Sequence, residues 1–158
     1  MTFTIRRYRH LSALLLSLLP TFASAGPEPA LQPVNPPGVT IPGVSQAVIA
    51  RSDRILFLSG HVPFDETGAM ADDLEGQVNQ VFANMQATLA AAGTDFSALA
   101  RVTLYIKDYD PSQLPMLRQV RDKWIVTDTP PASALIGVDA LFVPQAMVEV
   151  DAVAVLPE

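Results

Sequence analysis

The last thirty residues of the chain constrain its fold more than any other segment. The Pro130-Pro131 pair precedes a short apolar run, Pro144 marks a turn, and residues 147–155 then alternate small and β-branched side chains around Glu149. Proline fixes φ and donates no backbone hydrogen bond, so these prolines mark the ends of regular structure. Apolar runs of strand length between such turn signals are typical of β-strands. The chain is therefore predicted to end in two strands.

Two shorter apolar runs and a helix precede this region. Residues 47–49 and 55–59 flank a polar linker, which predicts a β-hairpin, and the continuous apolar character of the second run predicts a strand buried on both faces. From residue 74 to residue 89, apolar side chains recur at helical spacing. Asp73 and its neighbour Asp72 are start signals and Gly93 is a stop signal for this first helix.

A further strand and a second helix lie between the first helix and the C-terminal strands. Residues 101–107 alternate between apolar and polar side chains, which predicts a strand with one wetter face. Asp110-Pro111 is typical of a helix start, and the apolar side of the predicted helix carries Leu117, Val120 and Trp124. The predicted order is thus β-β-α-β-α-β-β.

This order predicts an α/β fold of the α+β sandwich type, with one mixed sheet and two helices on one of its faces. Two helices leave the other face of the sheet uncovered. The chain has no cysteine, so no disulfide stabilises the domain. Because a half-apolar open face on a small domain is most readily buried against other subunits, we expect a homo-oligomer.

The N-terminus has the pattern of a secretory signal peptide at residues 1–25. A basic region is followed by an apolar region at residues 11–19 and by a small-residue cleavage motif that ends at Ala25. A membrane anchor is the alternative, but nine mostly apolar residues are too few to span a bilayer. Proline-rich residues 26–42 predict an extended tether, and residues 43–158 a single folded domain. We expect a periplasmic or secreted protein with no membrane attachment after cleavage.

Charge and composition disfavour two classes of partner. Cleavage after Ala25 would remove three arginines and no acids, which leaves 7 basic and 16 acidic residues. This acidic balance argues against nucleic acid as a partner. Without cysteine, and with His61 as the only histidine after cleavage, the chain is poorly supplied with ligands for zinc, so no metal is expected.

Three groups of side chains are candidates for chemistry. Glu149 and Asp151 lie two residues apart on a predicted strand, so both face the same side about 7 Å apart and could serve in acid–base catalysis; a solvated face of an edge strand is the alternative. Ser59, Gly60 and His61 lie where a strand breaks, a common place for ligand contacts, although a histidine there is more often a turn residue.

A serine nucleophile is the weakest of these candidates. Ser59 or Ser133 could be combined with His61 and Asp151, but no Gly-x-Ser-x-Gly motif supports such a site.

From residue 43 to its end, the chain resembles one domain of the reactive-intermediate deaminase (Rid, YjgF-like) family. The resemblance is carried by five segments: Val44-Ser-Gln-Ala-Val48, the turn Leu58-Ser-Gly-His-Val-Pro63, and residues 77–93, 102–108 and 147–154. It implies a chorismate-mutase-like fold, a homotrimer and three clefts between subunits. In deaminating members of this family the cleft hydrolyses enamines and imines without a cofactor.

The family pattern is only partly present in this chain. Glu149 matches the glutamate that positions the attacking water, and Ser59 and Gly60 match the turn that lines the cleft. The family's carboxylate-binding arginine is replaced by Ser133. The other departures are Val44 for a tyrosine, His61 for a glutamine, Leu117 for an asparagine and Leu135 for a cysteine.

These departures bear on the ligand. A serine hydroxyl does not replace the two charge-assisted hydrogen bonds of an arginine, so we expect an uncharged or hydrophobic ligand. The resulting hypothesis is an exported trimer that uses a water held by Glu149 to deaminate a small imine or enamine, with altered specificity. The alternative is a non-catalytic trimer that binds small molecules or acts like a chaperone.

Overall fold

The computed structural model describes residues 29–38 and 41–156. Its core is a four-stranded mixed sheet in the order β3-β6-β4-β5, formed by β3 (Ile55–His61), β6 (Val148–Val155), β4 (Leu99–Lys107) and β5 (Ala132–Val138). Strands β4 and β5 are parallel, and the other neighbouring pairs are antiparallel. The last strand of the chain therefore lies inside the sheet, between β3 and β4.

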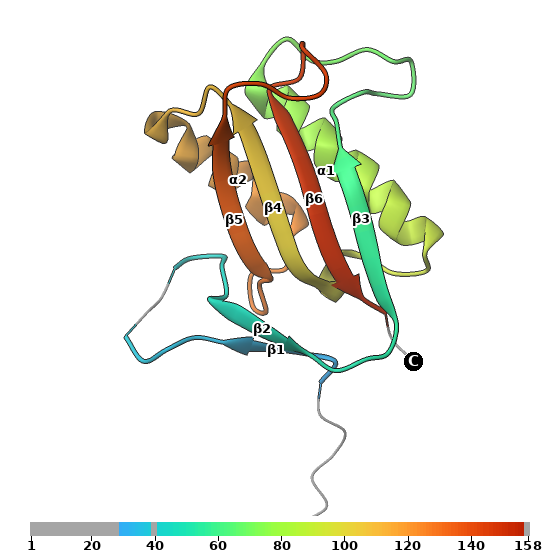
Figure 1. Ribbon diagram of the computed structural model, residues 1–158, viewed down its shortest axis with the longest axis vertical. Coiled ribbons are helices and arrows are strands. Elements are labelled where there is room, and N and C mark those ends of the chain that lie inside the picture. Colours follow the sequence, from blue (N-terminus) through green and yellow to red (C-terminus); the bar gives the residue numbers. More distant parts are fainter. Residues whose placement is uncertain (1–28, 39–40, 157–158) are drawn as a thin grey trace, which may run out of the picture.

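Two helices pack on one face of this sheet, α1 (Leu74–Ala91) and α2 (Leu114–Trp124) (Figure 1). The side chain of Asp73 accepts a hydrogen bond from the Gly76 amide and caps α1, as its sequence position predicts. Asp110 caps the short 3₁₀ helix η2 (Pro111–Gln113), which leads directly into α2. A second 3₁₀ turn, η1 (Phe96–Ala98), precedes β4. The predicted α+β layout of one mixed sheet with two helices on a single face is confirmed.

The core lies between the helices and the sheet. Val102, Leu104 and Ile106 of β4 point into it and are at most 3% exposed. On α1, Phe82 is fully buried and contacts the rings of Phe96 and Trp124, with centroids 6.0 and 6.3 Å away. Full burial of one such aromatic side chain contributes about 1.5–3 kcal/mol to the free energy of folding, so this cluster stabilises the packing of α1 against α2.

The predicted hairpin of residues 47–49 and 55–59 is wrong. Strand β2 (Ala47–Ala50) pairs instead with β1 (Leu31–Val34), and β3 pairs with the C-terminal strand β6. An apolar run predicts that a strand exists but not which strand it pairs with, and the partner of β3 lies about a hundred residues away in the sequence. The predicted burial of this strand on both faces is also wrong, because Phe57 is 76% exposed.

Strand β1 falls within residues 26–42, the range predicted to be an extended tether. Four residues of that range, Leu31–Val34, pair in register with β2 to form a separate two-stranded sheet (Figure 1). The predicted signal peptide at residues 1–25 lies outside the described residues. Among the helices of residues 29–38 and 41–156, none is long and apolar enough to cross a membrane.

Candidate functional site

A small cavity lies between α2, β4, β5 and the segment of residues 41–44. Its volume is about 190 Å³. The lining residues are mostly apolar, and the polar ones are Ser133, Arg118 and Arg121. Val44, Leu117, Ser133 and Leu135, which were predicted to share a site, all line this cavity. The other apolar lining residues are Ile41, Leu104 and Leu114.

Ser45 holds the segment of residues 41–46 against the start of β5. Its amide donates to the Pro131 carbonyl oxygen at 3.1 Å and its hydroxyl to the Pro130 carbonyl oxygen, and the side chain is 1% exposed. The carbonyl groups of both prolines before β5 thus accept a hydrogen bond from the same residue. This contact places Val44 beside Ser133 at the rim of the cavity.

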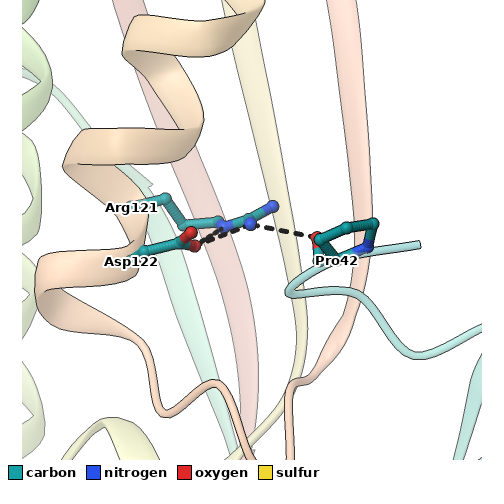
Figure 2. A network of polar contacts seen from close by, with 3 residues as sticks. All are labelled: Pro42, Arg121 and Asp122. Atoms are coloured by element: carbon teal, nitrogen blue, oxygen red, sulfur yellow. Dashed lines mark hydrogen bonds and ion pairs between the residues drawn. The ribbon is translucent and has the colours of Figure 1, made fainter. Parts of the chain in front are cut away.

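Arg121 ties the same segment to α2 (Figure 2). Its guanidinium donates to the Asp122 carboxylate at 2.7 and 2.9 Å and to the Pro42 carbonyl oxygen at 3.3 Å. Gly43 adopts φ +69°, and a Cβ built there would lie 2.1 Å from an Arg121 nitrogen. The absence of a side chain at residue 43 therefore permits this close approach.

Arg118 lies one helical turn before Arg121 and lines the same cavity, but it is not engaged in the same way. Within residues 29–38 and 41–156, its guanidinium has neither a hydrogen bond nor an ion pair. The side chain is half-buried. An unpaired guanidinium is thus available to a ligand in the cavity.

Glu149 occupies a second location, on the face of the sheet that the helices leave open. It pairs with Tyr105 across the strands, whereas their neighbours Val150 and Leu104 point into the core. The carboxylate lies against the backbone at Gly60, where a Cβ would be 2.0 Å from Oε1. The carboxylate accepts no hydrogen bond from the described residues, so its lone pairs are open to water or to a ligand.

Asp151 lies on the same face as Glu149, as predicted, but it is already engaged. The Tyr105 hydroxyl donates to its carboxylate at 3.1 Å. This hydrogen bond is the main cause, with a contribution from desolvation, that raises the pKa of the Tyr105 phenol above its ordinary value of 10.0. The two carboxylates therefore differ in environment: Asp151 accepts a hydrogen bond from a side chain, and Glu149 accepts none from the described residues.

His61 does not join Glu149 or Asp151. Its Nδ1 lies 2.8 Å from the Ser59 carbonyl oxygen, and its Nε2 lies 2.8 Å from the hydroxyl of Thr88 on α1. Both ring nitrogens are occupied by local partners. The Ser/His/Asp arrangement weighed from the sequence is not formed.

The predicted site residues therefore fall into two groups within one chain. Val44, Leu117, Ser133 and Leu135 line the cavity on the helix side of the sheet. Glu149 and Gly60 meet on its open face, with Ser59 and His61 beside them in β3. Strand β4 separates the strands that carry Ser133 and Glu149, so a single chain does not bring these two side chains together.

Sequence reasoning missed Arg118 as a cavity residue. The signal was present in the spacing, because Leu114, Leu117, Arg118 and Arg121 follow the i, i+3, i+4, i+7 pattern of one helix face. The two arginines at the end of this stripe would ordinarily be read as solvated. Only the position of residues 41–44 over α2 converts the stripe into a cavity wall.

A larger hollow of about 490 Å³ lies beside the loop of residues 64–72. Its polar residues include Gln77, whose side chain donates to the carbonyl oxygens of Ala71 and Gln145 and accepts from the Met147 amide at 2.7 Å. Gln77 is therefore satisfied and serves to hold the loops. Among the described residues, no cluster of histidine, cysteine, aspartate or glutamate could hold a metal ion.

Comparison with known proteins finds one family and several relatives. The family described as endoribonuclease L-PSP matches residues 39–156. Protein DfrA from Myxococcus xanthus is 36% identical over 114 residues, which cover 70% of this chain and 83% of DfrA. The 2-iminobutanoate/2-iminopropanoate deaminase of Salmonella typhimurium is 34% identical over 55 residues, which cover 34% of this chain and 43% of the deaminase.

A similar solved structure is that of the conserved Rid-family protein YyfB from Yersinia pestis. It superimposes with a TM-score of 0.72 at 29% identity and covers 80% of this chain and 99% of YyfB. The likeness includes nearly the whole of that protein.

Proposed function

The chain belongs to the endoribonuclease L-PSP family, also called the Rid, YjgF or RutC family, and on this premise we propose that it is a hydrolytic deaminase of a small imine or enamine. The name of the Salmonella relative describes that activity for 2-imino acids. The observation that carries the proposal is the position of Glu149. Its carboxylate lies against Gly60 on the open face of the sheet, with no competing hydrogen bond from the described residues.

The chemistry requires one carboxylate and one water. Glu149 accepts a proton from the water as its oxygen attacks the imine carbon, and the carboxylic acid gives that proton to the imine nitrogen, so that a carbinolamine forms. Glu149 then takes the proton of the carbinolamine hydroxyl and passes it to the amino nitrogen, the C–N bond breaks, and ammonia and a carbonyl compound leave. Atoms and charges balance without a cofactor, and none is proposed.

We propose that the complete site forms between subunits of a homotrimer. The cavity with Ser133 and the Glu149 carboxylate lie on opposite sides of the sheet, so a neighbouring subunit is needed to combine them. The exposed apolar side chains of the sheet support this arrangement: Phe57 is 76%, Ile55 51% and Ile136 41% exposed. Burial of these side chains against a second copy would stabilise the assembly.

We also propose export through the signal peptide of residues 1–25 and a small molecule, rather than RNA, as the ligand. The family description includes an endoribonuclease. The net charge of −6 argues against a polyanionic substrate for this chain, because phosphate neutralisation dominates the affinity for nucleic acids.

A non-catalytic trimer that binds small molecules is the second candidate. The observation that favours it is the cavity lining, in which Val44, Leu117 and Leu135 are apolar. The sequence resemblance adds that Ser133 replaces the family's arginine. Both candidates require a ligand in the cavity. They differ in whether an imine is consumed.

The proposed function is tested by the rate of imine disappearance. An amino-acid oxidase generates 2-imino acids, and the purified protein is added as wild type, Glu149→Gln or Asp151→Asn. We expect wild-type activity, a loss of at least about a hundredfold in Glu149→Gln, and a much smaller loss in the matched carboxylate control Asp151→Asn. Turnover by Glu149→Gln at the wild-type rate would remove Glu149 from the mechanism, and silence of the wild type would favour the binding protein.

A further inference from the structure

We infer that Arg118 on α2 binds a carboxylate of the ligand in the cavity between α2 and β5, in place of an arginine at residue 133. The inference rests on the proposed function, because it assigns the charged group of that reaction's substrate to one side chain. It also replaces the expectation, based on Ser133, that the ligand is uncharged.

Helix α2 has one basic side chain that no acidic side chain of the described residues pairs with. The helix carries three basic side chains, and two of them have partners: Arg121 binds Asp122, and Lys123 lies 3.9 Å from Glu75. Arg118 has no such partner within the described part of the chain, although it is half-buried and lines an apolar cavity. A guanidinium in such surroundings is stabilised by an anion that offers charge-assisted hydrogen bonds.

The position of Arg118 in the cavity also favours a carboxylate ligand. Ser133 on β5 and Arg118 on α2 line the same cavity, so its arginine lies on the helix instead of on the strand. Arg118 shares its helix face with Leu114, which also lines the cavity. The segment of residues 41–44 covers this face, and its attachment to Arg121 and to Pro131 fixes that cover. The cation is therefore held near a preformed apolar space.

The volume of the cavity limits the size of its ligand. A volume of about 190 Å³ equals that of about six water molecules in the liquid. The occupant is therefore a small aliphatic molecule, with its chain against Val44, Leu117 and Leu135. A carboxylate at one end could form two parallel hydrogen bonds with the guanidinium, and the Ser133 hydroxyl offers one more polar contact. The ligand class is a short aliphatic monocarboxylate.

The test uses butanoate and butanamide, which have the same shape and differ in charge. Each is titrated into isotope-labelled protein, and the shifts of the backbone amides are followed by nuclear magnetic resonance. We expect butanoate to bind at least about tenfold more tightly than butanamide and to shift amides at residues 41–44, 117–118 and 133–135, because a hydrogen bond to a charged group is worth more than one to a neutral group.

Variants then assign the binding to one side chain. Arg118→Gln is expected to weaken butanoate binding about tenfold, whereas Arg101→Gln removes the same charge from an exposed position outside the cavity and leaves binding unchanged. Arg118→Lys keeps the charge without the planar fork and is expected to fall between wild type and Arg118→Gln. Because lysine preserves helix propensity and charge, this variant remains informative if glutamine destabilises the fold.

Three results would overturn the inference: equal affinities for butanoate and butanamide, unchanged butanoate binding by Arg118→Gln, or a change of molecular mass by light scattering in that variant with no change in affinity. The last result would assign Arg118 to a subunit contact. Butanoate binding is measured without turnover, so the carboxylate site can be tested even if the protein is not a deaminase. Binding that depends on Arg118, together with an inactive wild type, would contradict the catalytic function and support the carboxylate site.

Discussion

Among single residues, Gly60 determines where the Glu149 carboxylate lies. A Cβ at residue 60 would be 2.0 Å from Oε1 and 2.9 Å from the carboxylate carbon. The carboxylate is the far end of a flexible side chain, so it can move aside without disturbing the strands. Glycine at this position therefore matters for the placement of the proposed proton acceptor, Glu149, more than for the stability of the sheet.

Gly60→Ala is expected to lower imine turnover by at least about tenfold, because a displacement of about 1 Å in a catalytic group can cost up to a hundredfold. The melting temperature should change by only a few degrees. In the Glu149→Gln background, Gly60→Ala should have no further effect on turnover, since both changes act on the same carboxylate. Additive losses in the double variant would show that Gly60 acts by another route.

The sequence was informative about single residues up to the point where three-dimensional placement was needed. It singled out Gly60 and Glu149, which meet, and Val44 and Ser133, which line one cavity. It did not separate these two pairs, because strand alternation gives a face only after the strand order is known. Arg118 was missed because the residues that close the cavity beside it, such as Ile41 and Val44, lie far from it in the sequence.

At the scale of structural elements, the segment of residues 41–46 and helix α2 form one unit around the cavity. Ser45 fixes the segment to the proline pair before β5, and Arg121 fixes it to the helix at Pro42. The glycine between these anchors adopts φ +69° next to the Arg121 guanidinium. A change at residue 43 therefore affects both the backbone and the arginine anchor.

Gly43→Ala is expected to destabilise the fold by more than the matched control Gly38→Ala. Both glycines have positive φ, which costs about 1–2 kcal/mol for a residue with a side chain. At Gly38, with φ +79°, an added Cβ would have nothing within 4 Å, whereas an added Cβ at Gly43 would displace Arg121. Urea unfolding measures the difference, and equal losses of unfolding free energy would mean that the contact with Arg121 is not stabilising.

The elements themselves were predicted well where their signals are local. Both helices were found from their apolar spacing and from caps such as Asp73 and Asp110. The pairing of β3 was predicted wrongly because its partner β6 is the last strand of the chain. Strand β1 was missed because proline at residue 33 resembles a tether signal, whereas edge strands tolerate proline.

At the scale of the whole molecule, the open face of the sheet is the surface through which we propose that copies of the chain assemble. Phe57 is 76% exposed on β3, where it pairs with Val153 of β6. Phe142 is 85% exposed but belongs to the loop between β5 and β6. The same substitution can therefore be made at an exposed phenylalanine on the sheet and, as a control, at one outside the sheet.

Phe57→Glu is expected to convert the trimer into monomers, because a carboxylate is costly to bury in an apolar contact. Phe142→Glu should leave the trimer unchanged. Light scattering with size-exclusion chromatography gives the masses directly. A wild-type protein that is already monomeric, or a Phe57→Glu variant with the wild-type mass, would contradict assembly through this face.

The place of β6 in the sheet has a consequence for how the protein is made. This strand follows β3, β4 and β5 in the sequence, yet it joins β3 on one side and β4 on the other. A nascent chain that lacks it holds two unconnected parts of a sheet, β3 alone and the pair β4-β5, so the four-stranded sheet closes only after β6 has been synthesised.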